Sequence, residues 1–339
     1  MNVRSYDFAL TRPLVTAMGT IESRKGFVVC IDSDGFKGYG EAAPMPPFSL
    51  ETHAQCGSDL ERGLKAIRSE GPANALMALP EDLCSSARCA LEVALLDWMA
   101  RQADAPLSFL LGGEGLDLLP VTALVGDDEG AEAAVARGHR LLKVKVGTRE
   151  TSEDVAFLED LLGGLSAEVL LRLDANGAFD LEQAERFFRA IAHLPVESVE
   201  DPLRLADIAH LKSLHHFQVG LGVDEAVRHP DALEGVFREQ SADYLVLKPM
   251  WCGGFLQSHA LGMAAAQHGI GVALSTALDG AIGRAACIQL ASALPSEALW
   301  PAGVDTGDWL AEDHCEVPMP IQDGHLRLGM LAGLGLELP

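Results

Sequence analysis

The sequence predicts an α/β protein whose larger part is a TIM-like barrel and whose first part is a smaller mixed region. From Pro120 onward, eight short apolar runs recur at intervals of roughly 20–30 residues, the period of a βα unit. Eight such units favour closure into a barrel over an open sheet. Residues 1 to about 115 instead mix alternating strand-like runs with helical stretches.

The first region contains one clear strand and one clear helix. Residues 26–31 (GFVVCI) are strand-like, and residues 85–100 carry apolar side chains at helical spacing. Ser85 or Ser86 is expected to cap this helix. The glycine-rich stretch 110–120 then indicates a linker.

The second region supplies the eight predicted strands. They are residues 120–125, 141–146, 169–175, 196–200, 219–224, 244–248, 271–275 and 299–304. Strands of a parallel barrel are covered on both faces and should be almost wholly apolar. Charged residues at the carboxyl ends of consecutive runs therefore need a reason, and in barrels those ends carry the chemistry.

Composition excludes several classes of function. The chain has 339 residues, with 49 Asp+Glu against 25 Lys+Arg and a net charge of -24. Such a chain is repelled by nucleic acid and by anionic membranes, so neither is expected as a partner. The start shows no signal peptide, no run is long enough to span a membrane, and seven scattered cysteines lack metal-site spacing, which together predict a cytoplasmic protein.

Three carboxylates end the third, fourth and fifth predicted strands: Asp174, Glu200 and Asp224. Because adjacent strands lie about 4.8 Å apart, these groups should converge. Without a cation they would repel one another, whereas a hard divalent cation such as Mg²⁺ makes the set stable and leaves positions for substrate and water. The alternative for any one of them is a helix N-cap, which becomes a poor explanation for all three in register.

Lysines flank this acidic set. Lys143 and Lys145 are two apart in a predicted strand and therefore share a face, where each should lower the pKa of the other toward that of a general base. An exposed edge pair is the alternative, but the apolar neighbours oppose it. Lys248 ends the sixth strand, across the barrel. A cation between opposed lysines suits removal of a proton alpha to a carboxylate.

At these positions the sequence resembles the enolase superfamily, in its muconate-lactonising subgroup. The matching motifs are K-x-K at Lys143 and Lys145, D-A-N at Asp174, E-D-P at Glu200, D-E at Asp224 and K-P at Lys248. The resemblance covers essentially the whole chain. It implies an α+β capping domain over residues 1–115, a (β/α)7β barrel over 116–310 and a C-terminal segment, 311–339, that returns to the cap.

A cap segment points to one branch of this subgroup. Residues 38–52 are similar to a G-E-x-x-P-x-P-x-F-S-x-E-T pattern of o-succinylbenzoate synthases, with a proline-rich surface loop as the structural alternative. The matching residues are Gly40, Glu41, Pro44, Pro46, Phe48, Ser49, Glu51 and Thr52. The resemblance implies Mg²⁺-dependent syn-dehydration of 2-succinyl-6-hydroxy-2,4-cyclohexadiene-1-carboxylate to 2-succinylbenzoate in menaquinone biosynthesis, with Mn²⁺ as a substitute ion.

The resemblance also implies residue roles. Lys145 would be the base and Lys248 the opposed cation, with Asp174, Glu200 and Asp224 as metal ligands. Supporting polar groups would be Lys143, Arg172 and Asn176. Binding of the small dicarboxylate substrate would fall to Phe48, Ser49, Gly253, Gly254, Ser275 and Thr276, although Gly253 and Gly254 also suit a tight βα turn.

Two other functions remain open. One is an N-acylamino acid racemase or dipeptide epimerase that uses the same lysines. Dipeptide epimerases usually carry D-x-D after the eighth strand, whereas Asp305 and Asp308 are three apart here. The other is a non-catalytic barrel, which would be expected to have lost a ligand or a lysine. The oligomeric state is not predicted.

Overall fold

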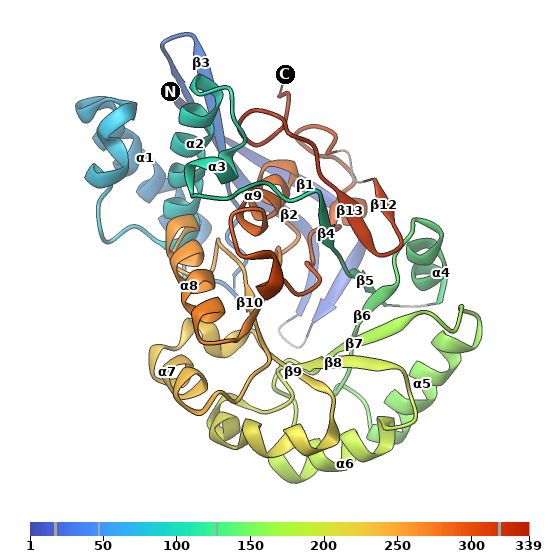
Figure 1. Cartoon of the computed structure of the whole chain (residues 1–339). Helices are drawn as coiled ribbons and strands as arrows, with labels where there is room; N and C mark the ends of the chain where they lie inside the picture. The colour runs from blue at the N-terminus through green and yellow to red at the C-terminus, as the bar shows by residue number, and fades with distance from the viewer. Residues whose placement is uncertain (17–18, 47, 127, 318–319, 339) are drawn as a thin grey trace.

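The computed structural model describes residues 1–16, 19–46, 48–126, 128–317 and 320–338. Its N-terminal part is an antiparallel sheet of β1 (Asn2–Thr16), β2 (Gly19–Ser33) and β3 (Phe36–Ala42), in that order. The helices α1 (His53–Glu70) and α2 (Ser85–Gln102) pack against it (Figure 1). The predicted strand at 26–31 lies inside β2, and the predicted helix at 85–100 is α2.

Helix α2 is buried nearly all round, because the sheet lies on one side of it and barrel helix α8 (Phe255–Gln267) on another. The predicted serine cap is wrong. Cys84 occupies the N-cap position and makes no side-chain cap. The Ser86 hydroxyl instead donates to Glu51 Oε1 at 2.5 Å, so it ties the helix to the preceding loop.

The barrel strands follow in the predicted order. Seven parallel strands form one sheet in the described residues, ordered β11-β10-β9-β8-β7-β6-β5. Their bounds are β5 (Ala123–Val125), β6 (Leu141–Lys145), β7 (Leu170–Asp174), β8 (Val196–Glu200), β9 (Gly220–Val223), β10 (Tyr244–Leu247) and β11 (Gly271–Leu274). Each lies inside a predicted run, which confirms these seven predictions.

The eighth predicted run closes the barrel without forming a regular strand. Residues 299–304 make isolated parallel bridges to β11 on one side and to Val121 on the other. Trp300 N donates to Val272 O at 2.9 Å, and Ala302 N donates to Pro120 O at 2.8 Å. Pro301 lies between them and has no N–H to extend the ladder, which explains the interruption.

Helices cover the outside of the barrel, as Figure 1 shows. They are α4 (Asp128–Ala136), α5 (Thr151–Gly163), α6 (Leu181–Ile191), α7 (Pro230–Glu239), α8 and α9 (Ala281–Ala291), with a 3-10 segment at Leu205–Phe217. A short 3-10 turn, η3 (Glu225–Arg228), follows β9. The parallel βα order with outer helices confirms the α/β barrel class with a capping part.

The lower layer of the barrel interior is filled by large side chains. Tyr244 and Trp300 stack with ring centroids 4.2 Å apart. Gly222 and Gly271 lie beside these rings, and a Cβ added at either position would collide with them. The missing side chains therefore make room for the aromatic pair, and the barrel is a packed core rather than a pore.

The last part of the chain runs back across the molecule. Strands β12 (Ile321–Gln322) and β13 (His325–Arg327) form a small sheet with β4 (Leu118–Pro120), beside the barrel (Figure 1). Residues 333–336 then reach α2, where Arg101 donates to Leu336 O at 2.7 Å. The domain boundaries at 115/116 and 310/311 stay predictions.

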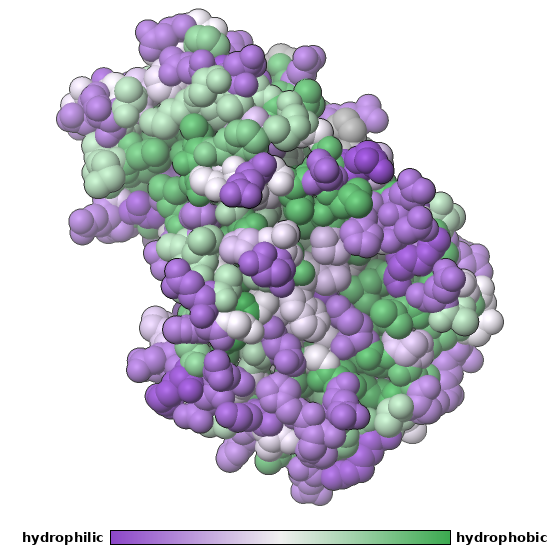
Figure 2. Space-filling model, viewed as in Figure 1, coloured by the Kyte–Doolittle hydropathy of each residue, from purple (hydrophilic) through white to green (hydrophobic). Residues whose placement is uncertain are grey.

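Hydrophilic residues cover much of the visible face, with apolar areas between them (Figure 2). Within the described ranges, none of the helices has the length and apolar character to cross a membrane. The sequence has 49 acidic side chains against 25 basic ones, and a hydrophilic surface gives such charged groups access to water.

Candidate active site

Three predicted metal ligands meet at the carboxyl ends of neighbouring strands. Asp174 on β7 is in register with Glu200 on β8, and Glu200 is in register with Gly222 on β9, two residues before Asp224. All three carboxyl groups are buried, with exposed fractions of 3%, 1% and 6%. Neighbouring strands therefore bring the three residues to one end of the barrel, but their carboxylate oxygens do not all lie within 4.8 Å of one another.

Lys143 lies directly against two of these carboxylates. Its Nζ is 2.6 Å from Glu200 Oε1 and 3.0 Å from Asp174 Oδ2. Burial alone would lower the pKa of Lys143, but Asp174, Glu200 and Asp224 outweigh this and raise it. The expectation that the paired lysines lower each other's pKa is thus wrong for Lys143, because the carboxylates are nearer and more numerous.

The other two lysines approach from opposite sides of the acidic set. Lys145, on β6, donates to Asn176 Oδ1 at 2.7 Å. Lys248, directly after β10, is bonded to Asp224, and its Nζ lies 4.8 Å from the ring centroid of Trp251. Since β7, β8 and β9 separate β6 from β10, the two ammonium groups lie on different sides of the carboxylates. Their roles in proton transfer stay predictions.

Asp174, Glu200 and Asp224 offer carboxylate oxygens, the donor type that suits a divalent cation. Burial raises the pKa of Glu200 to about 7; Lys143 opposes this shift, and Asp174 and Asp224 add to it. The pKa of the neighbouring Asp174 is lowered instead, because Lys143, Lys145 and Lys248 outweigh the effect of its burial. Clustered carboxylate oxygens are the ligands that hard cations such as Mg²⁺ prefer. The assignment of these three residues as ligands stays a prediction.

A second acidic group overlaps with the first. Carboxylate oxygens of Asp201, Asp224 and Glu225 lie within 4.8 Å of one another, a spacing that could hold a cation. Both Asp201 oxygens accept backbone N–H groups, from Asp224 and Glu225, at 2.9 Å each. We therefore assign Asp201 to positioning the Asp224 turn.

Asp201 and Glu225 were not among the predicted site residues. Both follow a predicted ligand directly in the chain, within the E-D-P and D-E motifs, and that adjacency was the available signal. Trp251 and Arg228 were also missed. They come from turns after β10 and β9, where single polar or aromatic residues carry no pattern of their own.

The predicted cap residues differ in where they lie. Phe48 packs against an apolar cluster that also contacts Leu124 and Trp251 at the mouth of the barrel. The Ser49 hydroxyl accepts from Met45 N and donates to Glu51 O, both at 3.0 Å, so it braces its own loop. Their roles in binding substrate stay predictions, and Phe48 has the better position.

The remaining predicted binding residues serve turns and strand ends. Gly253 and Gly254 have φ angles of 83° and 117° and precede helix α8, as expected for a tight βα turn. Thr276 shares a hydrogen bond of 3.0 Å with Thr306, and Ser275 lies against Gly303. The structure thus brings Ser275 and Thr276 to the barrel's carboxyl end; their contact with substrate stays a prediction.

Arg172 lies deeper than its predicted supporting role implies. It precedes Asp174 by two residues on β7, roughly 6–7 Å toward the barrel floor. All three guanidinium nitrogens are bonded, two of them to Glu197 and one to Pro301 O. The guanidinium also lies 4.9 Å from the Tyr244 ring centroid. These contacts stabilise the lower barrel layer.

Family models match most of the chain. Residues 1–112 match the mandelate racemase / muconate lactonizing enzyme N-terminal domain, and residues 127–339 match the enolase C-terminal domain-like family. A chloromuconate cycloisomerase of Cupriavidus pinatubonensis is 29% identical over 351 residues, covering 98% of this chain and 94% of that relative.

Two further relatives carry other activities in their names. An o-succinylbenzoate synthase of Desulfotalea psychrophila is 27% identical over 354 residues, covering 91% of this chain and 93% of the relative. The crystal structure of a dipeptide epimerase from Enterococcus faecalis with Mg and a dipeptide has a TM-score of 0.88 at 26% identity, covering 98% of each chain. With both domain models matched, this chain belongs to the enolase superfamily, in its muconate-lactonising subgroup.

Proposed function

We propose that this enzyme is an o-succinylbenzoate synthase, which removes water from 2-succinyl-6-hydroxy-2,4-cyclohexadiene-1-carboxylate to form 2-succinylbenzoate in menaquinone biosynthesis. The observation that carries the proposal is the placement of Lys145 and Lys248 on opposite sides of three buried carboxylates. This arrangement suits proton removal next to a carboxylate. The similarity of the 38–52 cap segment to such synthases supports the dehydration over the other reactions of the subgroup.

In the proposed reaction, Lys145 does the proton work. Its neutral amine takes the proton alpha to the ring carboxylate, and the ammonium so formed gives a proton to the departing hydroxyl on the same face, releasing water. Lys248 would stabilise the intermediate anion from the other face. Mg²⁺, held by Asp174, Glu200 and Asp224, would supply positive charge beside the substrate carboxylate. Asn176 would orient Lys145 through their hydrogen bond.

The epimerase alternative is weakened by the surroundings of Asp305 and Asp308. Asp305 Oδ2 lies 2.7 Å from His139 Nε2, and Asp308 pairs with Arg137 at 2.9 Å. Both carboxylates therefore have partners on the segment before β6. An acid that holds a substrate ammonium should instead be available inside the barrel mouth.

A muconate cycloisomerase is the second candidate, because the chloromuconate cycloisomerase relative is 29% identical over nearly the whole chain. The same lysines would then serve a different substrate. Localisation in the cytoplasm remains part of the proposal. So does the absence of nucleic-acid or membrane partners, which the acidic net charge supports.

One assay separates these candidates. The purified enzyme is incubated with the cyclohexadiene substrate and Mg²⁺, and aromatisation is followed by ultraviolet absorbance. We expect turnover that excess EDTA abolishes and added Mg²⁺ restores. Parallel reactions contain cis,cis-muconate, or N-succinylamino acids in D₂O. Lactonisation, or exchange of the alpha proton, without aromatisation of the diene would replace the synthase with the cycloisomerase or the racemase.

A further inference from the structure

Arg228 extends the candidate site beyond the residues considered so far. It ends the η3 turn that begins directly after Asp224, so it lies beside the acidic set in the chain. Its Nη1 donates to Phe48 O of the cap loop at 2.7 Å. Its guanidinium carbon lies 5.2 Å from the ring centroid of Trp251. Arg228 therefore contacts both the cap and the barrel at the mouth of the site.

Trp251 connects Arg228 with the predicted reaction centre. The same indole ring has Lys248 Nζ 4.8 Å from its centroid. The two cationic groups are thus at most 10.0 Å apart, the sum of their distances to that centroid. A small molecule with two anionic groups can reach from one to the other.

Donor atoms at this position lack partners. Arg228 Nε and Trp251 Nε1 are both buried and make no hydrogen bond within the described part of the chain. Buried polar atoms in native proteins are nearly always bonded to protein or to water, so these two donors on contacting side chains need an acceptor that the described residues do not supply. A carboxylate offers two acceptor oxygens and a charge that complements the guanidinium.

We propose that Arg228, together with the indole N–H of Trp251, binds the second carboxylate of the substrate and so makes the enzyme selective for dicarboxylates. The inference rests on the proposed function for the identity of that substrate, where the second carboxylate ends the succinyl chain. In a chain of net charge -24, a second anionic group needs a local cation, and Arg228 provides one at most 10.0 Å from Lys248.

The competing explanation is a purely structural one, in which Arg228 only fastens the cap loop through Phe48 O. If Arg228 only holds the cap loop in place, its replacement should weaken binding of every ligand equally, because the loop covers them all. A carboxylate-binding role affects only ligands that carry the second carboxylate. The difference between matched ligands therefore separates the two.

The test measures binding without turnover. Tryptophan fluorescence with Mg²⁺ present gives dissociation constants for 2-succinylbenzoate, cis,cis-muconate and benzoate, which lacks the second carboxylate. For R228M we expect binding of the best dicarboxylate to weaken between about tenfold and 150-fold, the range of a charged hydrogen bond. Benzoate binding should stay within about twofold, and R228K should recover part of the loss. R238M, on exposed α7, is the matched control.

Several outcomes would overturn the inference. Equal weakening of benzoate and the dicarboxylates in R228M would assign Arg228 to fastening the loop. Unchanged dicarboxylate binding, or a native enzyme that binds benzoate as tightly as both dicarboxylates, would remove the second-carboxylate site. W251F should lose selectivity in the same direction, read by calorimetry, and serves if R228M does not fold. Failure to aromatise the diene, with selective binding intact, would count against the proposed function alone.

Discussion

Two lysines only two residues apart have different surroundings. Lys143 is held between Asp174 and Glu200, and the carboxylates raise its pKa, so it is a fixed cation of the acidic set. Lys145 lies one step farther along β6 and touches the neutral amide of Asn176 instead. Of these two lysines, Lys145 is the one that the proposed reaction uses as the base.

This separation predicts the effect of replacing Lys145. The K145A variant should turn over the diene about 10²–10⁴-fold more slowly than the native enzyme, because a positioned acid or base usually contributes that much to the rate. Because its ammonium group bonds to Asn176 and not to the carboxylates, Mg²⁺ affinity measured by calorimetry should stay within a few fold of the native value. K65A, on the exposed face of α1, is the control. Activity above one tenth of native in K145A would contradict the base assignment.

The residues that could be predicted from sequence are those whose position follows from strand ends alone. Asp174, Glu200 and Lys145 belong to this group, since a parallel barrel brings such ends together. Arg172 does not, because one of its hydrogen bonds goes to Pro301 O, on a distant chain segment with no local pattern. Sequence periodicity places a residue on a face; it says nothing of which distant carbonyl that residue will meet.

At the level of elements, the same distinction holds. Seven strands could be predicted because runs buried on both faces must be apolar and evenly spaced. Residues 299–304 occupy the eighth strand position without forming a regular strand, since Pro301 interrupts the hydrogen bonds there. The helix cap was mispredicted because Ser86 bonds to Glu51 rather than to its own helix.

Strand β9 shows how a strand can depend on a missing side chain. Gly222 lies beside the ring of fully buried Tyr244. We expect G222A to lower the free energy of unfolding by about 1–3 kcal/mol, the usual cost of overpacking a core. Guanidinium denaturation monitored by circular dichroism measures this loss.

The matched control for that substitution is G163A. Gly163 is the last residue of α5, and an added Cβ would contact nothing within 4 Å. The free energy of unfolding of this variant should stay within about 0.5 kcal/mol of the native value. It can rise slightly, because alanine lowers the conformational entropy of the unfolded chain. If G222A is as stable as G163A, the aromatic floor of the barrel tolerates an extra methyl group and the packing argument fails.

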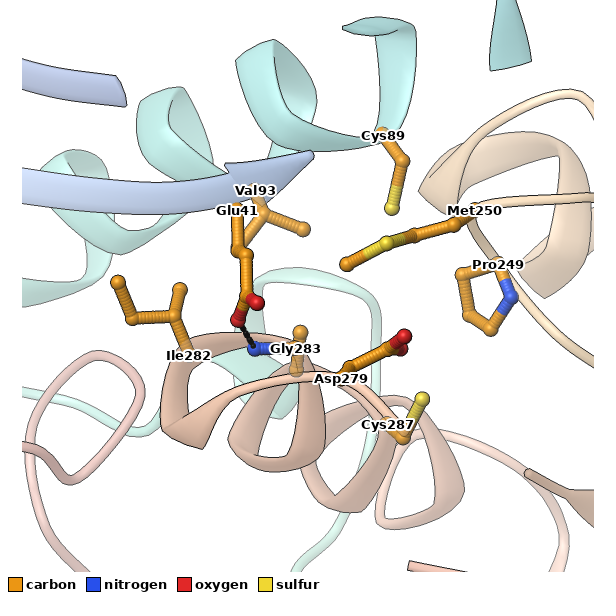
Figure 3. Close-up of a pocket in the computed structure, with 10 residues that line it drawn as sticks. Glu41, Cys89, Val93, Pro249, Met250, Asp279, Ile282, Gly283 and Cys287 are labelled. Atoms are coloured by element: carbon orange, nitrogen blue, oxygen red, sulfur yellow. Dashed lines mark hydrogen bonds between the residues drawn. The ribbon is translucent and has the colours of Figure 1, made fainter. Parts of the chain in front are cut away.

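At the level of the whole molecule, cap and barrel share buried ionisable groups. Glu41, on β3, accepts hydrogen bonds from Gly280 N and Gly283 N at the start of α9, both at 2.8 Å. Figure 3 shows Glu41 reaching down to Gly283, with Asp279 and Cys287 on the barrel side of the same small cavity. The cap is thus bound to the barrel through acidic side chains that are almost completely buried.

Asp279 makes this interface sensitive to pH. Burial raises its pKa from 3.8 to about 7; Glu41 adds to the shift and Arg24 opposes it. A carboxyl group with a raised pKa stabilises the fold while it is protonated. That contribution is complete below the unfolded pKa and is lost as the pH rises through about 7.

Replacement of Asp279 by Asn should therefore flatten the dependence of stability on pH. An amide stays neutral and can still accept from Ala277 N, as the carboxyl does at 3.3 Å. Between pH 5 and pH 8 the native enzyme should lose up to about 1.4 kcal/mol more per pH unit than D279N, the limit for one proton. Guanidinium unfolding across this range measures both slopes, and their difference cancels the titration of groups that both proteins share, Glu200 included.

D104N, at an exposed turn, should retain the native slope. Parallel curves for D279N and native enzyme would mean that Asp279 is ionised throughout this range, held by Arg24 across their 3.8 Å contact; the cap would then be joined to the barrel by an ion pair rather than by a neutral acid.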